Sequence, residues 1–184
     1  ERGMGASFTS GTNWSNANLI TIDPDHKAAA KELEFTAETL APGASRSGLL
    51  PKPEQVEAPN PFAHREKYNV LELIAVVAVK RVSQKEDVVC LEKESAIVLT
   101  DQVEGEGNDR SLSWTAPDDG EYELITFWMH GTGQTATPSV SISYTVNYLD
   151  KYGVEALIDY WNKEVLTPEL RDYIKQNGRV QMYM

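Results

Sequence analysis

Asparagine and tryptophan side chains gather in one short stretch near the start of the chain, where their chemistry fits contact with a sugar. Asn13, Trp14, Asn16 and Asn18 follow residues 3–10, which have the small and apolar side chains of a short buried strand. Amide groups bond hydroxyls, and an indole face stacks on the apolar face of a pyranose. The stretch therefore predicts a sugar-contacting rim. The alternative is a turn in which asparagine adopts left-handed backbone and Trp14 simply packs.

His130 is a further candidate for substrate contact. It follows Trp128 at the end of a predicted strand and precedes the glycine-rich break at residues 131–133. A histidine at a strand end is usually a half-exposed structural residue, and substrate contact by His130 is what the family resemblance given below implies. His26 and His64 lie on loops without the spacing of a metal site or of nucleophilic catalysis. We assign substrate binding to Asn13, Trp14, Asn16 and His130, and assign no catalytic residue and no metal ligand.

An acidic loop offers oxygen atoms of the kind that Ca²⁺ binds. Its polar residues are Asp101, Glu104, Glu106, Asn108 and Asp109. Calcium takes six or more oxygen ligands, but these residues lack the spacing of a calcium-binding loop. A solvated hairpin is the preferred interpretation, so no cofactor is assigned to this chain. Asp23 and Asp25 flank Pro24 and are interpreted as turn residues.

Composition excludes several classes of function. The 184 residues suit one domain or one and a half, and carry 17 Lys and Arg against 28 Asp and Glu, a formal charge of −11. This balance disfavours nucleic acid and anionic membrane surfaces as partners. No apolar run reaches the roughly 20 residues that span a bilayer. The single cysteine, Cys90, lies among valines and a leucine, which predicts a buried thiol.

Alternating and β-branched segments in the middle of the chain predict an antiparallel β-sandwich, jelly-roll-like in form. Residues 31–38 alternate polar and apolar side chains, as does the segment 111–115 around Trp114. Residues 68–82 are rich in β-branched side chains, as in a strand covered on both faces. Further strands are predicted at 19–22, 96–100, 121–129 and 139–146, and a proline-rich surface connection at 51–61.

After residue 148 the spacing of the apolar side chains changes from a period of two residues to a period of 3.6 residues. Val154, Leu157, Ile158, Trp161 and Val165 lie on one face of a helix. Thr167 and Pro168 then begin a second helix, which ends at Asn177 and Gly178. The chain continues into a final strand that reaches Met184. Trp114 and Trp161 fall in amphipathic patterns, so both are expected in a core.

A strand followed by helices and another strand is the repeating unit of a parallel α/β fold. The sandwich then interrupts one such unit. We predict a mainly β fold class: a β-sandwich inserted in a β/α barrel unit, with C-terminal α-helices. The expected domains are a partial barrel strand and loop at 1–18, the sandwich at 19–148, and partial barrel helices and a strand at 149–184. In β/α barrels the sites lie after the carboxyl ends of strands, where this sandwich would begin.

Three stretches match the motifs of a known family: residues 3–14 (GMGASFTSGTNW), 111–122 (SLSWTAPDDGEY) and 146–150 (VNYLD) with the following helix. Together they resemble glycoside hydrolase family 106, the α-L-rhamnosidases and their relatives. The chain departs from the family pattern at Ser7, at Asn13 and at residues 151–153. The resemblance implies a barrel with inserted sandwich elements, inverting hydrolysis with two separated carboxylates, and a Ca²⁺ ion in the parent enzyme. It also implies a periplasmic or extracellular location.

On this resemblance the chain is an inactive fragment of an enzyme that degrades polysaccharide, with the catalytic carboxylates beyond Met184. The sandwich would shape the cleft for an α-L-rhamnosyl or similar linkage. The implied partners are carbohydrate and the rest of the parent chain, with self-association through the terminal helices as a further expectation. The alternatives are a stand-alone β-sandwich module that binds carbohydrate or protein without hydrolysis, and a structural spacer.

Overall fold

The computed structural model describes residues 6–10, 14–55, 66–135 and 142–182. Contacts divide the chain into two compact units, each treated separately below. The sandwich unit comprises residues 32–55 and 70–130, and the helical unit comprises residues 1–31, 56–69 and 131–184. No described helix is long and apolar enough to cross a membrane.

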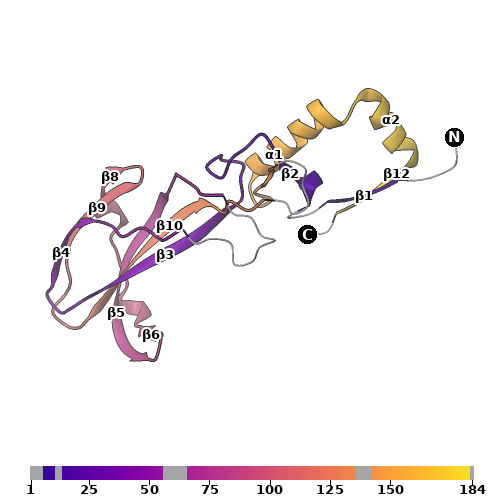
Figure 1. The fold of residues 1–184 in the computed structure, drawn as a ribbon. Helices are drawn as coiled ribbons and strands as arrows, with labels where there is room; N and C mark the ends of the chain where they lie inside the picture. Colours follow the sequence, from indigo (N-terminus) through magenta and orange to yellow (C-terminus); the bar gives the residue numbers. More distant parts are fainter. Residues whose placement is uncertain (1–5, 11–13, 56–65, 136–141, 183–184) are drawn as a thin grey trace. The chain divides into compact units, whose positions relative to one another are not determined.

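The sandwich unit is built from two sheets (Figure 1). One has five strands in the order β3-β10-β5-β6, with β7 also pairing with β5, and the other has the order β4-β9-β8. The strands are β3 (Lys31–Leu40), β4 (Ser45–Leu49), β5 (Glu72–Lys85), β6 (Val88–Leu91), β7 (Ile97–Val98), β8 (Glu104–Glu106), β9 (Asp109–Thr115) and β10 (Tyr122–Gly131).

Strand pairing in the sandwich unit is nested. The first strand, β3, lies beside the last, β10, and the second, β4, lies beside the next to last, β9, in the other sheet. This is the wrapping of a jelly roll, in which one long hairpin rolls into two layers. The predicted antiparallel, jelly-roll-like β-sandwich is therefore confirmed.

The interior of the sandwich contains the apolar side of its strands. Trp128, Leu124, Leu112, Val76 and Leu99 are fully buried. β10 supplies inward side chains at alternate positions. It pairs with β5, and the register of this pairing shifts between Phe127 and Trp128. The indole of Trp128 donates a 2.9 Å hydrogen bond to the Pro51 carbonyl, as a buried indole requires.

β3 departs from the usual sandwich pattern, because its apolar side chains face solvent. Leu33 and Phe35 are 57% and 65% exposed, while Glu32, Glu34 and Glu38 are half-buried or close to it. Glu38 meets Arg46 at 3.2 Å, and Arg46 also donates to the carbonyls of Leu112 and Leu49. The inward carboxylate of Glu38 therefore has a specific partner in Arg46.

The helical unit has a small core of its own. Leu19, Ile22, Ala29 and Val146 are buried together, and Leu157 and Tyr160 pack against them. Its elements are β1 (Ala6–Ser10), β2 (Asn18–Leu19), β11 (Tyr144–Thr145), α1 (Lys151–Tyr160), α2 (Pro168–Asn177) and β12 (Gly178–Met182), with a π-helical turn at Trp161–Val165.

Both C-terminal helices begin at residues suited to capping. The Asp150 carboxylate accepts a 3.0 Å hydrogen bond from the Tyr152 amide, and the Thr167 hydroxyl accepts one of 3.2 Å from the Leu170 amide. The predicted helices are thus confirmed. Trp161 and Trp114 were both expected in a core, and both are half-buried.

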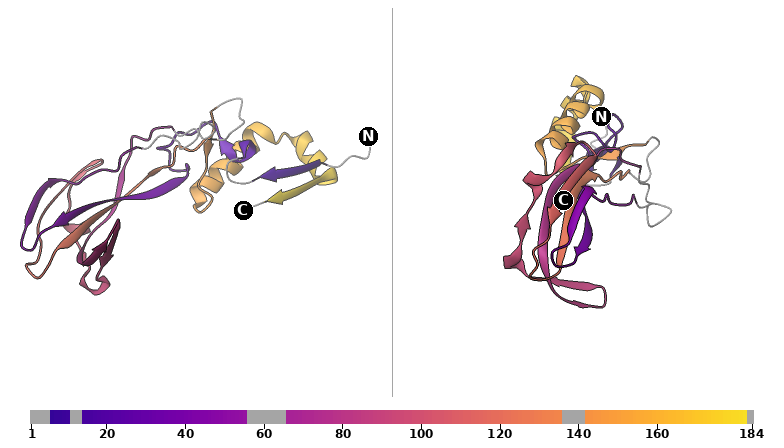
Figure 2. Two further views of the ribbon diagram at one scale, coloured as in Figure 1. Left: turned by 60° about the horizontal axis from the view of Figure 1, so that its bottom comes forward. Right: turned by 90° about the vertical axis from the view of Figure 1, so that its left-hand side faces the viewer.

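β1 and β12 are parallel neighbours, in register from Ala6 opposite Gly178 to Ser10 opposite Met182. Figure 2 shows the two strands side by side with their arrows in one direction. Since parallel neighbours need a crossover connection, the whole intervening chain serves as that crossover. A strand, helices and a second parallel strand were expected from the sequence, and the sandwich lies in chain order between β1 and α1.

Candidate functional site

The predicted sugar rim falls in the helical unit. Trp14 is 56% exposed. Asn16 is half-buried, and its backbone carbonyl accepts a 3.0 Å hydrogen bond from the Trp161 indole. Asn13 lies outside the described residues. An exposed indole is available for stacking, and sugar contact by these residues stays a prediction.

Asn18 has a structural role, and its place in the proposed rim is wrong. It is 5% exposed. Its amide nitrogen lies 3.3 Å from both the Ser143 carbonyl and the Thr145 hydroxyl, which ties β2 to β11. The turn interpretation of Asp23 is confirmed, because its carboxylate accepts a 2.8 Å hydrogen bond from the His26 amide.

His130 lies in the sandwich unit, between two glutamates of the neighbouring strand. Its Nδ1 is 3.8 Å from Glu32 Oε1 and its Nε2 is 3.4 Å from Glu34 Oε2. The imidazole is 1% exposed, and the two glutamate side chains are 28% and 32% exposed. One ligand-type atom from each of the three residues lies within 4.8 Å of the others. We call these three residues the acid-histidine cluster.

Strand pairing assembles this cluster. Glu32 and Glu34 are two residues apart on β3 and share a face, because side chains alternate along a strand. β10 is the neighbour of β3, and its inward row ends at His130. The sequence singled out His130 as a substrate contact, which stays a prediction. It missed both glutamates, which were interpreted only as the polar half of an alternating strand. A Glu-x-Glu pair on one strand was the available signal, but its partner strand depends on topology.

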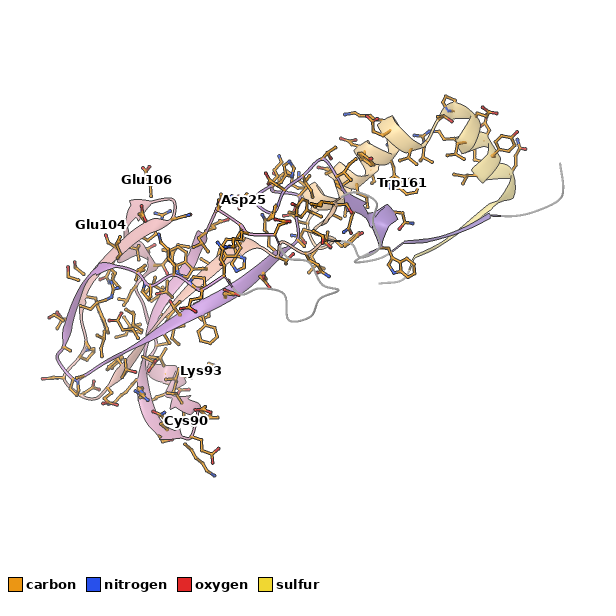
Figure 3. The ribbon with its side chains drawn as sticks, viewed as in Figure 1. Asp25, Cys90, Lys93, Glu104, Glu106 and Trp161 are labelled. Carbon is orange, nitrogen blue, oxygen red and sulfur yellow. The ribbon has the colours of Figure 1, made fainter. Side chains whose placement is uncertain are left out.

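The acidic hairpin forms as the sequence predicted. β8 and β9 pair antiparallel from Glu104 opposite Ser111 to Glu106 opposite Asp109. Figure 3 shows Glu104 and Glu106 at the outer side of this hairpin, and both are exposed. Asn108 Oδ1 accepts from the Leu71 amide, and Asp109 accepts from Lys52 at 2.8 Å. These two oxygens bond to separate partners outside the hairpin.

Cys90 corrects another expectation. The thiol is exposed on β6, near the tip of the β5-β6 hairpin (Figure 3). Its valine and leucine neighbours suggested a buried position, but β6 lies at the edge of the five-stranded sheet. There the apolar residues Val88 and Leu91 are exposed as well. Local apolar sequence therefore does not mean burial at a sheet edge.

Charge pairing and burial shift several pKa values. A hydrogen bond from Lys80 to Asp119, 2.8 Å long, lowers the pKa of Asp119 and raises that of Lys80. Burial, the largest cause, raises the pKa of Tyr122. In the helical unit, burial raises the pKa of Tyr144 and that of Tyr148, the latter to about 12. None of these groups belongs to the acid-histidine cluster.

The outer face of the five-stranded sheet exposes apolar side chains. Leu33 and Phe35 of β3 lie on this face with Phe127 of β10, whose ring centroid is 6.1 Å from that of Phe35. Val98 of β7 is 68% exposed and pairs with Val77 in the same sheet. An exposed apolar face on a sheet is suited to contact with a partner.

No protein-family model matches the chain, and no curated protein or solved structure matches it significantly.

Proposed function

We propose that this chain is a non-catalytic part of a glycoside hydrolase that acts on α-L-rhamnosyl or similar linkages of a polysaccharide, and that its sandwich shapes the substrate cleft. The observation that carries the proposal is the parallel pairing of β1 with β12, with the sandwich between β1 and the helices in chain order. This is the order expected of an insertion in a parallel α/β unit.

The position of the insertion supports a role in substrate binding. The chain leaves β1 at its carboxyl end and reaches the exposed Trp14 within a few residues. Parallel α/β proteins bind their ligands beyond the carboxyl ends of the strands. We expect an insertion that begins there to border the cleft. The acidic surface, with a net charge of −11, fits a neutral sugar better than a polyanion.

Hydrolysis of an aryl α-L-rhamnoside tests the proposal. The full gene product that contains this chain is compared with the 184-residue chain alone. We expect release of the aryl group by the full product and none by the chain alone, because the proposal places the carboxylates outside it. Release by the chain alone would refute its non-catalytic role. A folded full product that releases nothing would refute the assignment to a rhamnosidase.

A binding module without hydrolase activity is the second candidate, favoured by the exposed apolar face of the five-stranded sheet. Phe35 is 65% exposed and lies beside Phe127, so the two rings offer an apolar surface to the face of a sugar. Under this alternative, the chain alone retains a rhamnose-containing polysaccharide in affinity electrophoresis, and Phe35→Ala weakens retention. Val88→Ala, a change at an exposed valine on β6, serves as the matched control.

A further inference from the structure

We propose that the acid-histidine cluster, Glu32, Glu34 and His130, is a binding site for a divalent transition metal ion, with Zn²⁺ as the best fit. This inference is independent of the proposed function, because it rests on the sandwich unit alone. It assigns to this chain a metal site that the sequence did not predict.

One pair of donor atoms, from His130 and Glu34, has the spacing of a first coordination shell. Zinc binds imidazole nitrogen and carboxylate oxygen at about 2.0–2.2 Å, so two ligands at a tetrahedral angle lie about 3.4 Å apart. His130 Nε2 and Glu34 Oε2 are 3.4 Å apart, and all three donor atoms lie within 4.8 Å. Glu32 Oε1 is 3.8 Å from the other ring nitrogen, Nδ1, so the half-buried Glu32 side chain must turn toward Nε2 to complete a three-ligand shell.

Charge and burial favour a cation at this place. Two carboxylates converge on an imidazole that is 1% exposed. Like charges brought close together in a partly buried setting repel one another, and a dication between them removes that repulsion. The same ion explains why β3 turns glutamates inward while Leu33 and Phe35 face solvent. An apolar inward face would be the ordinary choice for a sandwich strand.

The ligand set selects the kind of metal. Imidazole suits zinc and its neighbours in the first transition series, whereas Ca²⁺ and Mg²⁺ prefer sites built from oxygen alone. Three protein ligands leave a fourth zinc position for water. The two glutamates come from β3 and the histidine from β10, so a bound ion also fastens the first strand of the sandwich unit to its last.

Titration of the 184-residue chain with ZnCl₂ by calorimetry tests the site, with CaCl₂ and MgCl₂ as comparison ions. The variants are Glu34→Gln, His130→Gln and, as matched control, His26→Gln. His26 is exposed and lies outside the cluster, with its Nδ1 accepting from the Ala28 amide. Co²⁺ provides a second readout, since a site with few ligands gives visible d–d absorption.

We expect one zinc ion per chain, bound at least ~10-fold more weakly by Glu34→Gln and by His130→Gln and unchanged by His26→Gln. Zinc should also raise the unfolding temperature of the unsubstituted chain and not that of Glu34→Gln. Because His130 is buried and its variant can misfold, the partly exposed Glu34 carries the decisive test, with near-UV circular dichroism confirming its fold. Absence of zinc binding by the folded chain, or equal binding by folded Glu34→Gln, overturns the proposal.

Discussion

At the scale of single residues, Tyr148 makes the stability of the helical unit depend on pH. Its hydroxyl donates a 2.7 Å hydrogen bond to the Ala17 carbonyl, and burial raises its pKa to about 12. An unfolded tyrosine has a pKa of about 10. The folded state therefore favours the protonated phenol. The stabilisation it gives is complete below about pH 10 and is lost as pH rises towards about 12.

Replacement of Tyr148 by phenylalanine should reduce this pH dependence. We expect Tyr148→Phe to cost about 1 kcal/mol at neutral pH, the net value of one hydrogen bond, and to lose less stability than the unsubstituted chain above pH 10. Urea unfolding from pH 8 to 11.5 measures both effects. Tyr173→Phe, at a 57% exposed site, is the control. Parallel stability curves for Tyr148→Phe and the unsubstituted chain would refute the role of this phenol.

Residue-scale prediction succeeded where chemistry is local. The Thr167 cap and the Asp23 turn need only neighbouring backbone, and both follow from the sequence. The prediction of a buried Cys90 thiol failed because the exposure of this residue depends on β6 being at the edge of a sheet. The acid-histidine cluster was missed because Glu34 and His130 are far apart in sequence. Only the pairing of β3 with β10 brings them together.

At the scale of elements, helix α1 depends on a close approach at Gly153. This residue is buried in the first turn, and a Cβ atom there would overlap the Asn147 carbonyl oxygen. Alanine is favoured over glycine in helices by about 1 kcal/mol, but a clash with backbone outweighs that preference.

We therefore expect Gly153→Ala to destabilise the chain by about 1–3 kcal/mol, although it improves helix propensity. Denaturant midpoints measure the change by fluorescence of the tryptophans. Glu155→Ala, at an exposed position of the same helix, should leave the midpoint nearly unchanged. An increase in stability for Gly153→Ala would show that α1 does not approach Asn147 closely.

Helices and strands were predictable from the sequence when the periodicity of their apolar side chains was strong. The central strand β5, the alternating β9 and both helices appear where the sequence indicates them, with ends shifted by a few residues. β4 was missed because residues 45–49 (SRSGL) are mostly polar and follow a turn signal. Hydrogen bonds to β9 and the buried guanidinium of Arg46 hold that strand, and neither is visible as periodicity.

At the scale of the whole chain, the proposed function depends on which strands pair and on the order of the elements along the chain. Periodicity gives the number and type of strands but not their neighbours, so the nested order of the sandwich emerges only from the structure. The parallel relation of β1 and β12 was expected from the strand-helix-strand order. It is also the observation on which the proposed insertion depends.

A disulfide cross-link between β1 and β12 tests that relation most directly. Parallel neighbours lie about 4.8 Å apart, within the reach of a disulfide between opposed residues. Cys90 is first replaced by serine, and cysteines are placed at Ser7 and Arg179, which are register partners. The mismatched control joins Ser7 to Met182, which pairs with Ser10 and so lies roughly three residues, about 10 Å, further along the strand.

Mass spectrometry of the tryptic peptides after mild oxidation is the readout. We expect the disulfide in the Ser7–Arg179 pair in high yield, little in the mismatched pair, and unchanged circular dichroism. A cross-link formed equally by both pairs, or by neither while the chain stays folded, would contradict the parallel pairing and with it the insertion of the sandwich between two adjacent strands.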